Sequence, residues 1–314
     1  MENILGKLKY MLNKGKGLTE IATELGISEN EVIGMVIKLK EEGYMYDYIN
    51  GAVQKVKPAI ERGEITIGQK KDRVRFIALS DTHLGSKWDN LKLLEHAYET
   101  AENDGCDFVA HSGDMFEGDF KGKRPDHIYQ VKALGLEQLD YVIQNYPKSE
   151  IPTYYITGNH DGTFLKTAGA NIGKLLADRR TDLTYLGQDL GDIKIGKNTV
   201  RLRHGAGGGA YAKSYKLQKY CETLPIVDIP EFILQGHFHY SGYFRNRDIN
   251  CFNVPAMQGY TPYAKGLGLP EEMGFWEITY YTDSRGQIIS VVPELHQFKE
   301  KAPKLVRVDK RYQR

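Results

Sequence analysis

The spacing of apolar residues changes along the chain, and this change predicts a division into two parts. Near the N-terminus, Ile4, Leu8, Met11 and Leu12 recur at the period of an amphipathic helix. From Val74 onward, short apolar runs first alternate with helical stretches and later follow one another directly. We therefore expect a small helical module followed by a larger domain that contains β-sheet.

The first part carries the pattern of two helices joined by a short turn. Gly26 is a natural helix stop, and Ser28 with Glu31 has the spacing of a capping box that begins the next helix. Further on, Asn50-Gly51 lies between β-rich flanks and predicts a two-residue hairpin. Residues 1–57 are thus predicted to form a helix-turn-helix with a wing, similar to a winged helix.

Residues 58–72 contain proline, glycines and mixed charges, which predicts a linker with one short strand near 65–67. Residues 73–298 then read as an α/β domain, because strands alternate with helices in its first half. The last residues, 299–314, form a basic tail that we expect to fray. In order, the predicted elements are strand 74–79, helix 90–103, strand 107–111, helix 128–145, strand 153–157, and strands 192–195, 199–203, 232–235, 242–245, 251–254, 274–281 and 288–292.

Composition narrows the class of protein only slightly. The 42 basic and 41 acidic residues give a formal charge of +1, so net charge does not indicate a polyanionic partner. Cys106, Cys221 and Cys251 are far apart and form no CxxC pair, so the sequence supports neither a disulfide framework nor a thiolate zinc site. The N-terminus lacks a signal-peptide pattern, and no apolar run approaches the roughly 20 residues that span a bilayer. We expect a soluble, cytoplasmic protein with no membrane contact.

Five polar clusters follow predicted strands, where open α/β sheets place their sites. Each offers oxygen or imidazole ligands for a metal, and none offers a thiolate. Each cluster alone is weak evidence for a metal site, because a Gly-Asp pair is usually a turn and a lone histidine is usually structural. Five in this order are unlikely to arise by accident. They are Asp81-Thr82-His83, Gly113-Asp114, Gly158-Asn159-His160-Asp161, His204-Gly205 and Gly236-His237-Phe238-His239.

This order of motifs resembles the calcineurin-like metallophosphoesterase superfamily across about residues 73–295. The resemblance implies a four-layer α/β/β/α sandwich of two mixed sheets with flanking helices. It also implies two divalent cations, with Asp114 bridging them. Mixed carboxylate, amide and imidazole ligands suit manganese, which we expect, or iron or zinc. The resemblance assigns Asp81, His83 and His239 to the first metal, and Asn159, His204 and His237 to the second.

The resemblance implies hydrolysis by a hydroxide that bridges the two metals and attacks the phosphorus in line. His160 would protonate the leaving oxygen, a role suited to an imidazole with a pKa near neutrality. Asp161 would either orient the site or cap a loop, and the sequence leaves both open.

Several other polar residues have a plainer explanation beside a functional one. We expect a buried structural role for His111, and structural or surface roles for His96, His127 and His296. Glu117, Asp119 and Lys121 either rim the site or solvate a loop. The glycines of 205–209 favour a flexible turn over an anion site, and Tyr260, Tyr263 and Lys265 could contact a substrate.

Asp81-Thr-His-Leu-Gly85 and Gly113-Asp-Met-Phe116 look similar to the exonuclease branch that includes the SbcD- and Mre11-type nucleases. We therefore predict a phosphodiesterase, with DNA as the leading substrate. One alternative is a phosphomonoesterase acting on nucleotides or phosphoproteins. Another is a winged-helix adaptor with a silent phosphoesterase domain, which the complete ligand set opposes.

The N-terminal module gives little support for DNA binding. The helix that would enter the major groove begins with Glu29 and Glu31, which DNA phosphates would repel. A protein partner or a homodimer contact is at least as good an interpretation of this module.

Overall fold

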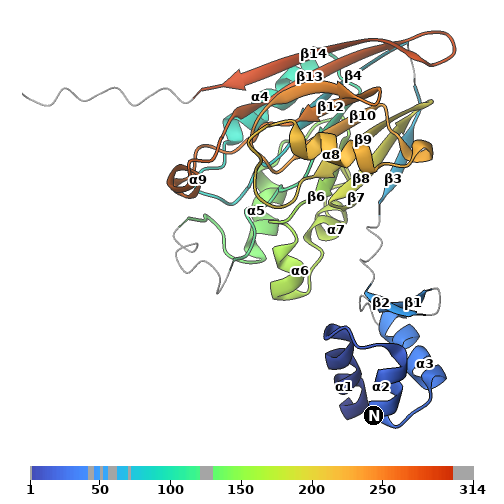
Figure 1. The fold of residues 1–314 in the computed structure, drawn as a ribbon. Coiled ribbons are helices and arrows are strands. Elements are labelled where there is room, and N and C mark those ends of the chain that lie inside the picture. Colours follow the sequence, from blue (N-terminus) through green and yellow to red (C-terminus); the bar gives the residue numbers. More distant parts are fainter. Residues whose placement is uncertain are drawn as a thin grey trace, which may run out of the picture. The chain divides into compact units, whose positions relative to one another are not determined.

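The structure, a computed structural model, describes residues 2–41, 46–49, 52–55, 62–69, 72–120 and 130–299. The chain divides into two compact units, Met1–Ile60 and Glu61–Arg314 (Figure 1). The predicted hairpin turn at Asn50-Gly51, much of the predicted linker, Lys121, His127 and nearly all of the basic tail lie outside the described residues.

In the residues described, the N-terminal unit contains three helices and one antiparallel pair of strands. These are α1 (Glu2–Asn13), α2 (Leu18–Leu25), α3 (Glu29–Glu41), β1 (Tyr46–Ile49) and β2 (Ala52–Lys55). Leu8, Ile21 and Val36 belong to its buried cluster, so the predicted helical spacing does point inward. The capping box is also present, since the amide of Ser28 donates to Glu31 Oε2 at 2.8 Å.

The described part of the second unit is built on two six-stranded sheets. The first sheet has the order β14-β13-β4-β5-β6-β7, with β4 to β7 parallel and β13 and β14 antiparallel at one edge. Its strands are β4 (Arg73–Leu79), β5 (Phe108–His111), β6 (Thr153–Thr157), β7 (Leu183–Gln188), β13 (Met273–Thr282) and β14 (Ile288–Phe298).

The second sheet has the order β11-β12-β10-β9-β8-β3 and mixes parallel and antiparallel pairs. Its strands are β3 (Glu64–Ile67), β8 (Leu190–Ile195), β9 (Asn198–His204), β10 (Phe232–Gly236), β11 (Gly242–Asn246) and β12 (Ile249–Asn253). The short strand expected inside the predicted linker is β3, which pairs with β8 at one edge of this sheet.

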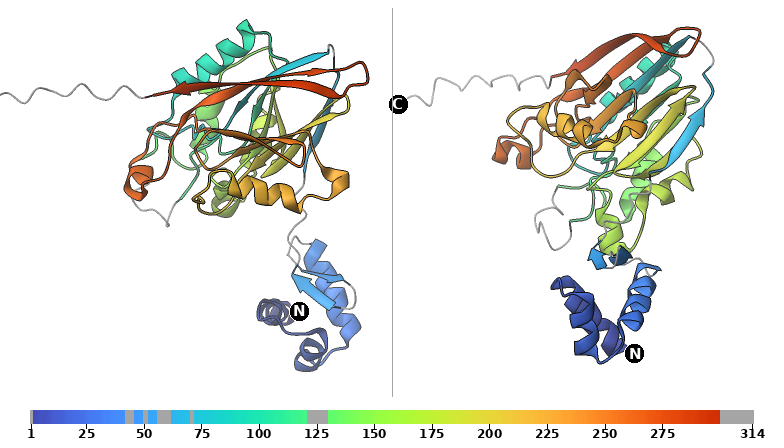
Figure 2. Two further views of the ribbon diagram at one scale, coloured as in Figure 1. Left: turned by 45° about the horizontal axis from the view of Figure 1, so that its top comes forward. Right: turned by 45° about the vertical axis from the view of Figure 1, so that its right-hand side comes forward.

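The helices of the second unit lie outside the sheets. They are α4 (Leu91–Asn103), α5 (Glu137–Asn145), α6 (Thr163–Ala168), α7 (Ile172–Ala177), α8 (Tyr215–Thr223), a 3-10 turn (Ile226–Asp228) and α9 (Pro262–Leu267). Figure 2 shows α4 and α8 on opposite sides of the paired sheets.

Alternation along β4 explains the layering. Phe76 and Ala78 join a buried cluster that includes residues of the second sheet, whereas Ile77 and Leu79 face the helices that cover the first sheet. A third cluster packs Cys221 of α8 against the outer face of the second sheet. The layers are therefore helix, sheet, sheet and helix, which confirms the predicted sandwich.

Two predicted bounds are wrong for local reasons. The helix predicted from residue 128 begins only at Glu137, because Gly135 adopts φ +51° and the apolar side chains of Leu134 and Leu136 are exposed. The last strand runs on to Phe298, because Pro293 lies on an edge strand, where a missing amide costs little. The strand β7 and the helices α6 to α9 were not predicted; α6, α7 and α9 have six residues each, which is less than two helical turns.

No helix in the described part of the chain is both long and apolar enough to span a bilayer.

Candidate metal centre

The predicted ligand motifs all follow strands that end at one edge of the two sheets. In the first sheet, β4 leads to Asp81 and His83, β5 leads to Asp114, and β6 leads to Asn159. In the second sheet, β9 ends at His204 and β10 leads to His237 and His239. Parallel neighbours such as β9 and β10 bring their carboxyl ends together, so loops distant in sequence meet at this edge.

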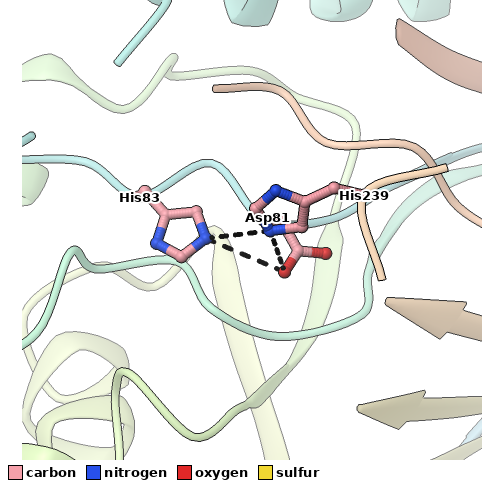
Figure 3. A group of neighbouring side chains, drawn as sticks. All are labelled: Asp81, His83 and His239. Atoms are coloured by element: carbon pink, nitrogen blue, oxygen red, sulfur yellow. Dashed lines mark hydrogen bonds and ion pairs between the residues drawn. The ribbon is translucent and has the colours of Figure 1, made fainter. Parts of the chain in front are cut away.

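Three side chains form the first group, shown in Figure 3. Asp81 Oδ1 lies 3.3 Å from His239 Nε2 and 3.8 Å from His83 Nε2, and the two imidazole nitrogens lie 3.4 Å apart. Asp81 Oδ1 is buried and accepts no hydrogen bond from any residue that the structure describes. A buried carboxylate oxygen that faces two imidazole nitrogens has the donor geometry of a cation site.

The second group is built around His204. Its Nε2 atom lies 3.1 Å from Asp114 Oδ2 and 3.2 Å from Asn159 Oδ1. The ring of His237 lies 5.1 Å from the ring of His204, and one ligand atom each from Asp114, His204 and His237 can be chosen within 4.8 Å of one another. The structure therefore brings all seven predicted ligands into two groups.

The backbone at these ligands is unusual. Five of the seven adopt a positive φ, a region that side chains other than glycine rarely enter and that often marks functional sites. These are Asp81 (52°), His83 (44°), Asp114 (53°), His237 (86°) and His239 (54°).

Glycines beside the ligands are required by close packing. A Cβ atom on Gly158 would lie 2.4 Å from Asp114 Oδ1, and one on Gly236 would lie 2.0 Å from Ser80 Oγ and 2.9 Å from Asp81 Oδ2. The glycines of the Gly-Asn-His and Gly-His-Phe-His motifs thus make room for the carboxylates.

Charge in the two groups is strongly coupled. Burial opposes ionisation of Asp81 and Asp114, yet neighbouring imidazoles, chiefly His239 and His204 respectively, hold the pKa of each carboxyl well below its usual range. Conversely, burial disfavours charged imidazoles, but Asp114 and Asp81 raise the pKa of His204 and His239 to about 10. Two buried carboxylates that need positive partners fit a pair of divalent cations.

Hydrogen bonds to backbone carbonyls orient the histidines of the second group. His204 Nδ1 donates to Ser112 O at 2.8 Å, and His237 Nε2 donates to Gly207 O at 2.9 Å. Because each carbonyl can only accept, the opposite nitrogen of each ring is left as the ligand atom. The glycine-rich loop of 205–209 therefore supports a histidine through a carbonyl, a role that the sequence did not suggest.

His160 contacts a member of each group and also Glu117, which lies in the loop after β5. Its amide donates to Asp114 Oδ1 at 2.8 Å, and its Nδ1 donates to Glu117 O at 2.5 Å. Its ring packs edge-on against His83 with centroids 4.4 Å apart. Burial lowers the pKa of His160 to about 4, against the opposing effect of Asp114. The bond from Nδ1 leaves Nε2 as the nitrogen available for proton transfer.

Asp161 ties two ligand loops together from behind. Its buried carboxylate accepts hydrogen bonds from the amides of Gly158 and Phe116, each at 2.8 Å, and from Met115 at 3.2 Å. Burial and Asp114 raise the pKa of Asp161 to about 7. Of the two roles left open by the sequence, these contacts favour loop capping, which also fixes the loops that carry Asp114 and Asn159.

The remaining predicted polar residues fall into two sets. His111 is buried and contacts Thr82 Oγ1 at 3.1 Å, while His96 and His296 pair with Glu99 and Glu277. Glu117, in contrast, is buried beside His83. Glu271, which also borders the site, lies on an irregular loop, and its sequence context gave no signal.

A cavity of about 520 Å³ opens onto both groups. Its lining includes His83, Asp114, His160, His237 and His239. Five described aromatic side chains also line the cavity, and these are Trp88, Tyr211, Phe238, Tyr240 and Tyr263. The candidate ligands therefore lie where a small molecule or a chain end can reach them.

Comparison with known proteins agrees with this geometry. The family model described as calcineurin-like phosphoesterase matches residues 74–241, a little more than half of the chain. No match was found among curated protein sequences.

Similar solved structures include a novel archaeal phosphodiesterase, with 15% identity, a TM-score of 0.42, and coverage of 71% of this chain and 100% of that one. Another is the phosphoesterase YfcE from E. coli, with 15% identity, a TM-score of 0.35, and coverage of 70% and 98%. A third is Vps29 with zinc from Entamoeba histolytica, with 15% identity, a TM-score of 0.38, and coverage of 72% and 100%.

Proposed function

The chain belongs to the calcineurin-like phosphoesterase family, and on this premise we propose that it hydrolyses a phosphodiester bond in a nucleic acid, with DNA as the leading substrate. The carrying observation is the convergence of seven oxygen and imidazole donors in two groups that border one cavity. Burying this many polar side chains costs free energy that apolar packing would not cost, so their convergence favours a bound ligand.

We propose that the two groups hold two divalent cations, with Asp114 shared between them. Asp81, His83 and His239 would hold the first cation. Asn159, His204 and His237 would hold the second. When bound, the cations would neutralise phosphate oxygens and activate water for attack. Because the donors are carboxylate, amide and imidazole, we favour manganese, with iron and zinc as alternatives.

His160 would act on the leaving oxygen through Nε2. Its Nδ1 proton is committed to Glu117 O, and its amide is anchored on Asp114, so the ring has one fixed orientation. Burial keeps this imidazole neutral near pH 7. An anionic phosphate placed beside it would raise the pKa of His160 and favour the protonated donor.

The cavity wall supports a diester that carries an aromatic group. Trp88, Tyr211 and Tyr263 line the same cavity as the two ligand groups. Stacking of a base on an aromatic side chain contributes about 1–3 kcal/mol. Among the described residues of the lining, Lys213 is the only lysine or arginine, and it pairs with Glu272. A singly charged diester suits this lining better than a doubly charged monoester.

The proposal places nucleic-acid contact on the second unit. In the N-terminal unit, the first turn of α3 carries Glu29 and Glu31, and Glu31 is held there by Ser28. These carboxylates would repel phosphates at the end of the helix that usually enters the major groove. We therefore favour a protein contact for the N-terminal unit.

The test is a substrate panel with the full chain and manganese. Rates are measured on bis-p-nitrophenyl phosphate, on p-nitrophenyl phosphate, and on single- and double-stranded DNA. The proposal expects faster turnover of the diester and cleavage of DNA. A clear preference for the monoester would replace it with a phosphomonoesterase. No turnover with any metal, together with retention of DNA in a gel, would instead support a binding protein.

A further inference from the structure

Two buried carboxylates lie directly behind the histidines of the first group. Glu117 Oε2 is 3.4 Å from His83 Nδ1, and Glu271 Oε1 is 3.6 Å from His239 Nδ1. The side chains of Glu117 and Glu271 are only 9% and 1% exposed. Each carboxylate therefore faces the ring nitrogen opposite the one that points at Asp81.

Among the described residues, the histidines of the second group form no such pair with a carboxylate behind them. There, the opposite nitrogens of His204 and His237 donate to the neutral backbone carbonyls of Ser112 and Gly207. Its third donor, Asn159, is also uncharged. The two groups thus share similar ligand atoms but differ in the charge that supports their histidines.

The carboxylates are held in place by contacts that do not involve the histidines. Gln258 Nε2 donates to Glu117 Oε2 at 3.2 Å, and the amide of Thr261 donates to Glu271 Oε2 at 3.0 Å. Yet His83 Nδ1 and Glu271 Oε1 are buried and form no hydrogen bond within the described part of the chain. A shift of a few tenths of an ångström would convert each close approach into a hydrogen bond.

A carboxylate behind a metal-binding imidazole fixes the ring and makes it a more basic ligand, and its loss typically lowers metal affinity by about 10- to 100-fold. Its negative charge, little screened in a buried site, also attracts the cation. The first effect acts on both histidines of the first group, whereas backbone carbonyls take the corresponding place behind His204 and His237.

We propose that Glu117 and Glu271 are positioning residues that make the first group bind its divalent cation more tightly than the second, so that the centre fills in a fixed order. This inference rests on the proposed two-metal function. It gives the protein a one-metal form, filled at Asp81, His83 and His239, over a range of limiting metal concentrations.

The experiment is an equilibrium titration of the metal-stripped full chain with Mn²⁺, followed by the EPR signal of free Mn²⁺. The wild type should show two classes of site, one tight and one weaker. Glu271→Gln should weaken the tight class by about 10- to 100-fold and leave the weak class unchanged. Glu117→Gln, on a different loop, should act on the same class.

A matched control is Glu272→Gln, next in the chain to Glu271. The side chain of Glu272 pairs with Lys213 and Ser241, and its amide, which the substitution does not alter, donates to His239 O at 2.8 Å. Both classes should be unchanged in this variant. Circular dichroism of each metal-stripped variant shows whether the fold is intact, and His237→Ala, which removes a donor from the second group, should abolish only the weak class.

Two equal classes in the wild type, or a tight class that survives both Glu→Gln substitutions in folded protein, would overturn the inference and leave the proposed function standing. Loss of both classes together in either variant would also overturn it. Absence of any Mn²⁺ binding by the wild type would instead count against the proposed function itself.

Discussion

The backbone amide of His160 donates a hydrogen bond to Oδ1 of Asp114 at 2.8 Å. The residue that we propose as proton donor is therefore attached, through its main chain, to the carboxylate that we propose as the shared ligand. A substitution of the His160 side chain leaves this backbone hydrogen bond possible. Proton donation by His160 and metal binding by Asp114 can therefore be tested separately.

His160→Gln should lower turnover of a diester by about 10²- to 10⁴-fold, the usual contribution of a general acid. Metal content should stay at the wild-type value, because the amide bond to Asp114 does not depend on the side chain. Metal analysis and rate measurement on one preparation check both expectations. Asp114→Asn is the comparison, and it should lose metal and turnover together. Full activity in His160→Gln would remove His160 from the mechanism.

Gly158→Ala should disrupt the second group although it replaces none of the ligand residues. The added methyl group would lie 2.4 Å from Asp114 Oδ1 and 2.6 Å from His204 Cδ2, so at least one ligand must move. We expect fewer bound ions per chain and a loss of stability of about 1–3 kcal/mol. Gly208→Ala is the control, because its methyl group would meet nothing within 4 Å. Equal metal content in the two variants would contradict the packing argument.

Trp88→Ala should raise the KM for a single-stranded oligonucleotide by about 5- to 150-fold, which corresponds to about 1–3 kcal/mol of lost stacking. An oligonucleotide whose terminal residue is abasic lacks the ring that would stack, so its KM should be nearly unchanged by the substitution. Tyr281→Ala, an exposed aromatic residue of β13 away from the cavity lining, serves as control. An equal rise in KM for both oligonucleotides would show that Trp88 does not bind a base.

Much of this site could be predicted because its ligands occur as short motifs after apolar strands. The strands themselves were recognisable, since β4, β5 and β6 are buried runs of apolar residues. The order of the motifs then indicated the ligand set. The positions of Asp81 and His239 in one group agree with that prediction.

The rest depended on tertiary contacts that no local pattern records. Glu271 follows a short helix and a proline, in a stretch that could equally have been an exposed loop, and only the fold brings it to His239. The strained φ values of Asp81 and Asp114 likewise have no compositional mark. The late start of α5 arose from Gly135, whose left-handed backbone is invisible in a pattern of apolar residues.

Acid should weaken the fold through Asp228. Burial opposes its ionisation, but hydrogen bonds from Arg62 and Arg201 outweigh burial and hold the pKa of this carboxyl below its usual value. The folded state therefore binds a proton less readily than the unfolded chain. The stabilisation is complete above a pH of about 4 and is lost as pH falls through the lowered pKa.

Asp228→Asn should accordingly lower the free energy of unfolding by about 1–3 kcal/mol at pH 7, with a gap that shrinks below about pH 4. Urea unfolding at a series of pH values measures this gap. Asp248→Asn is the control, because that side chain is 99% exposed and pairs only with Arg245. A gap that stayed constant from pH 7 to acid would rule out an ionised Asp228 as its source.

If seven side chains enclose two cations, anomalous X-ray diffraction from crystals grown with Mn²⁺ should locate both ions. We expect two peaks about 3.5–4 Å apart. One should lie among Asp81, His83 and His239, and the other beside His204 and His237, with Asp114 touching both. A single peak, or manganese bound instead at the Glu277, Glu294 and His296 group on β13 and β14, would contradict this expectation.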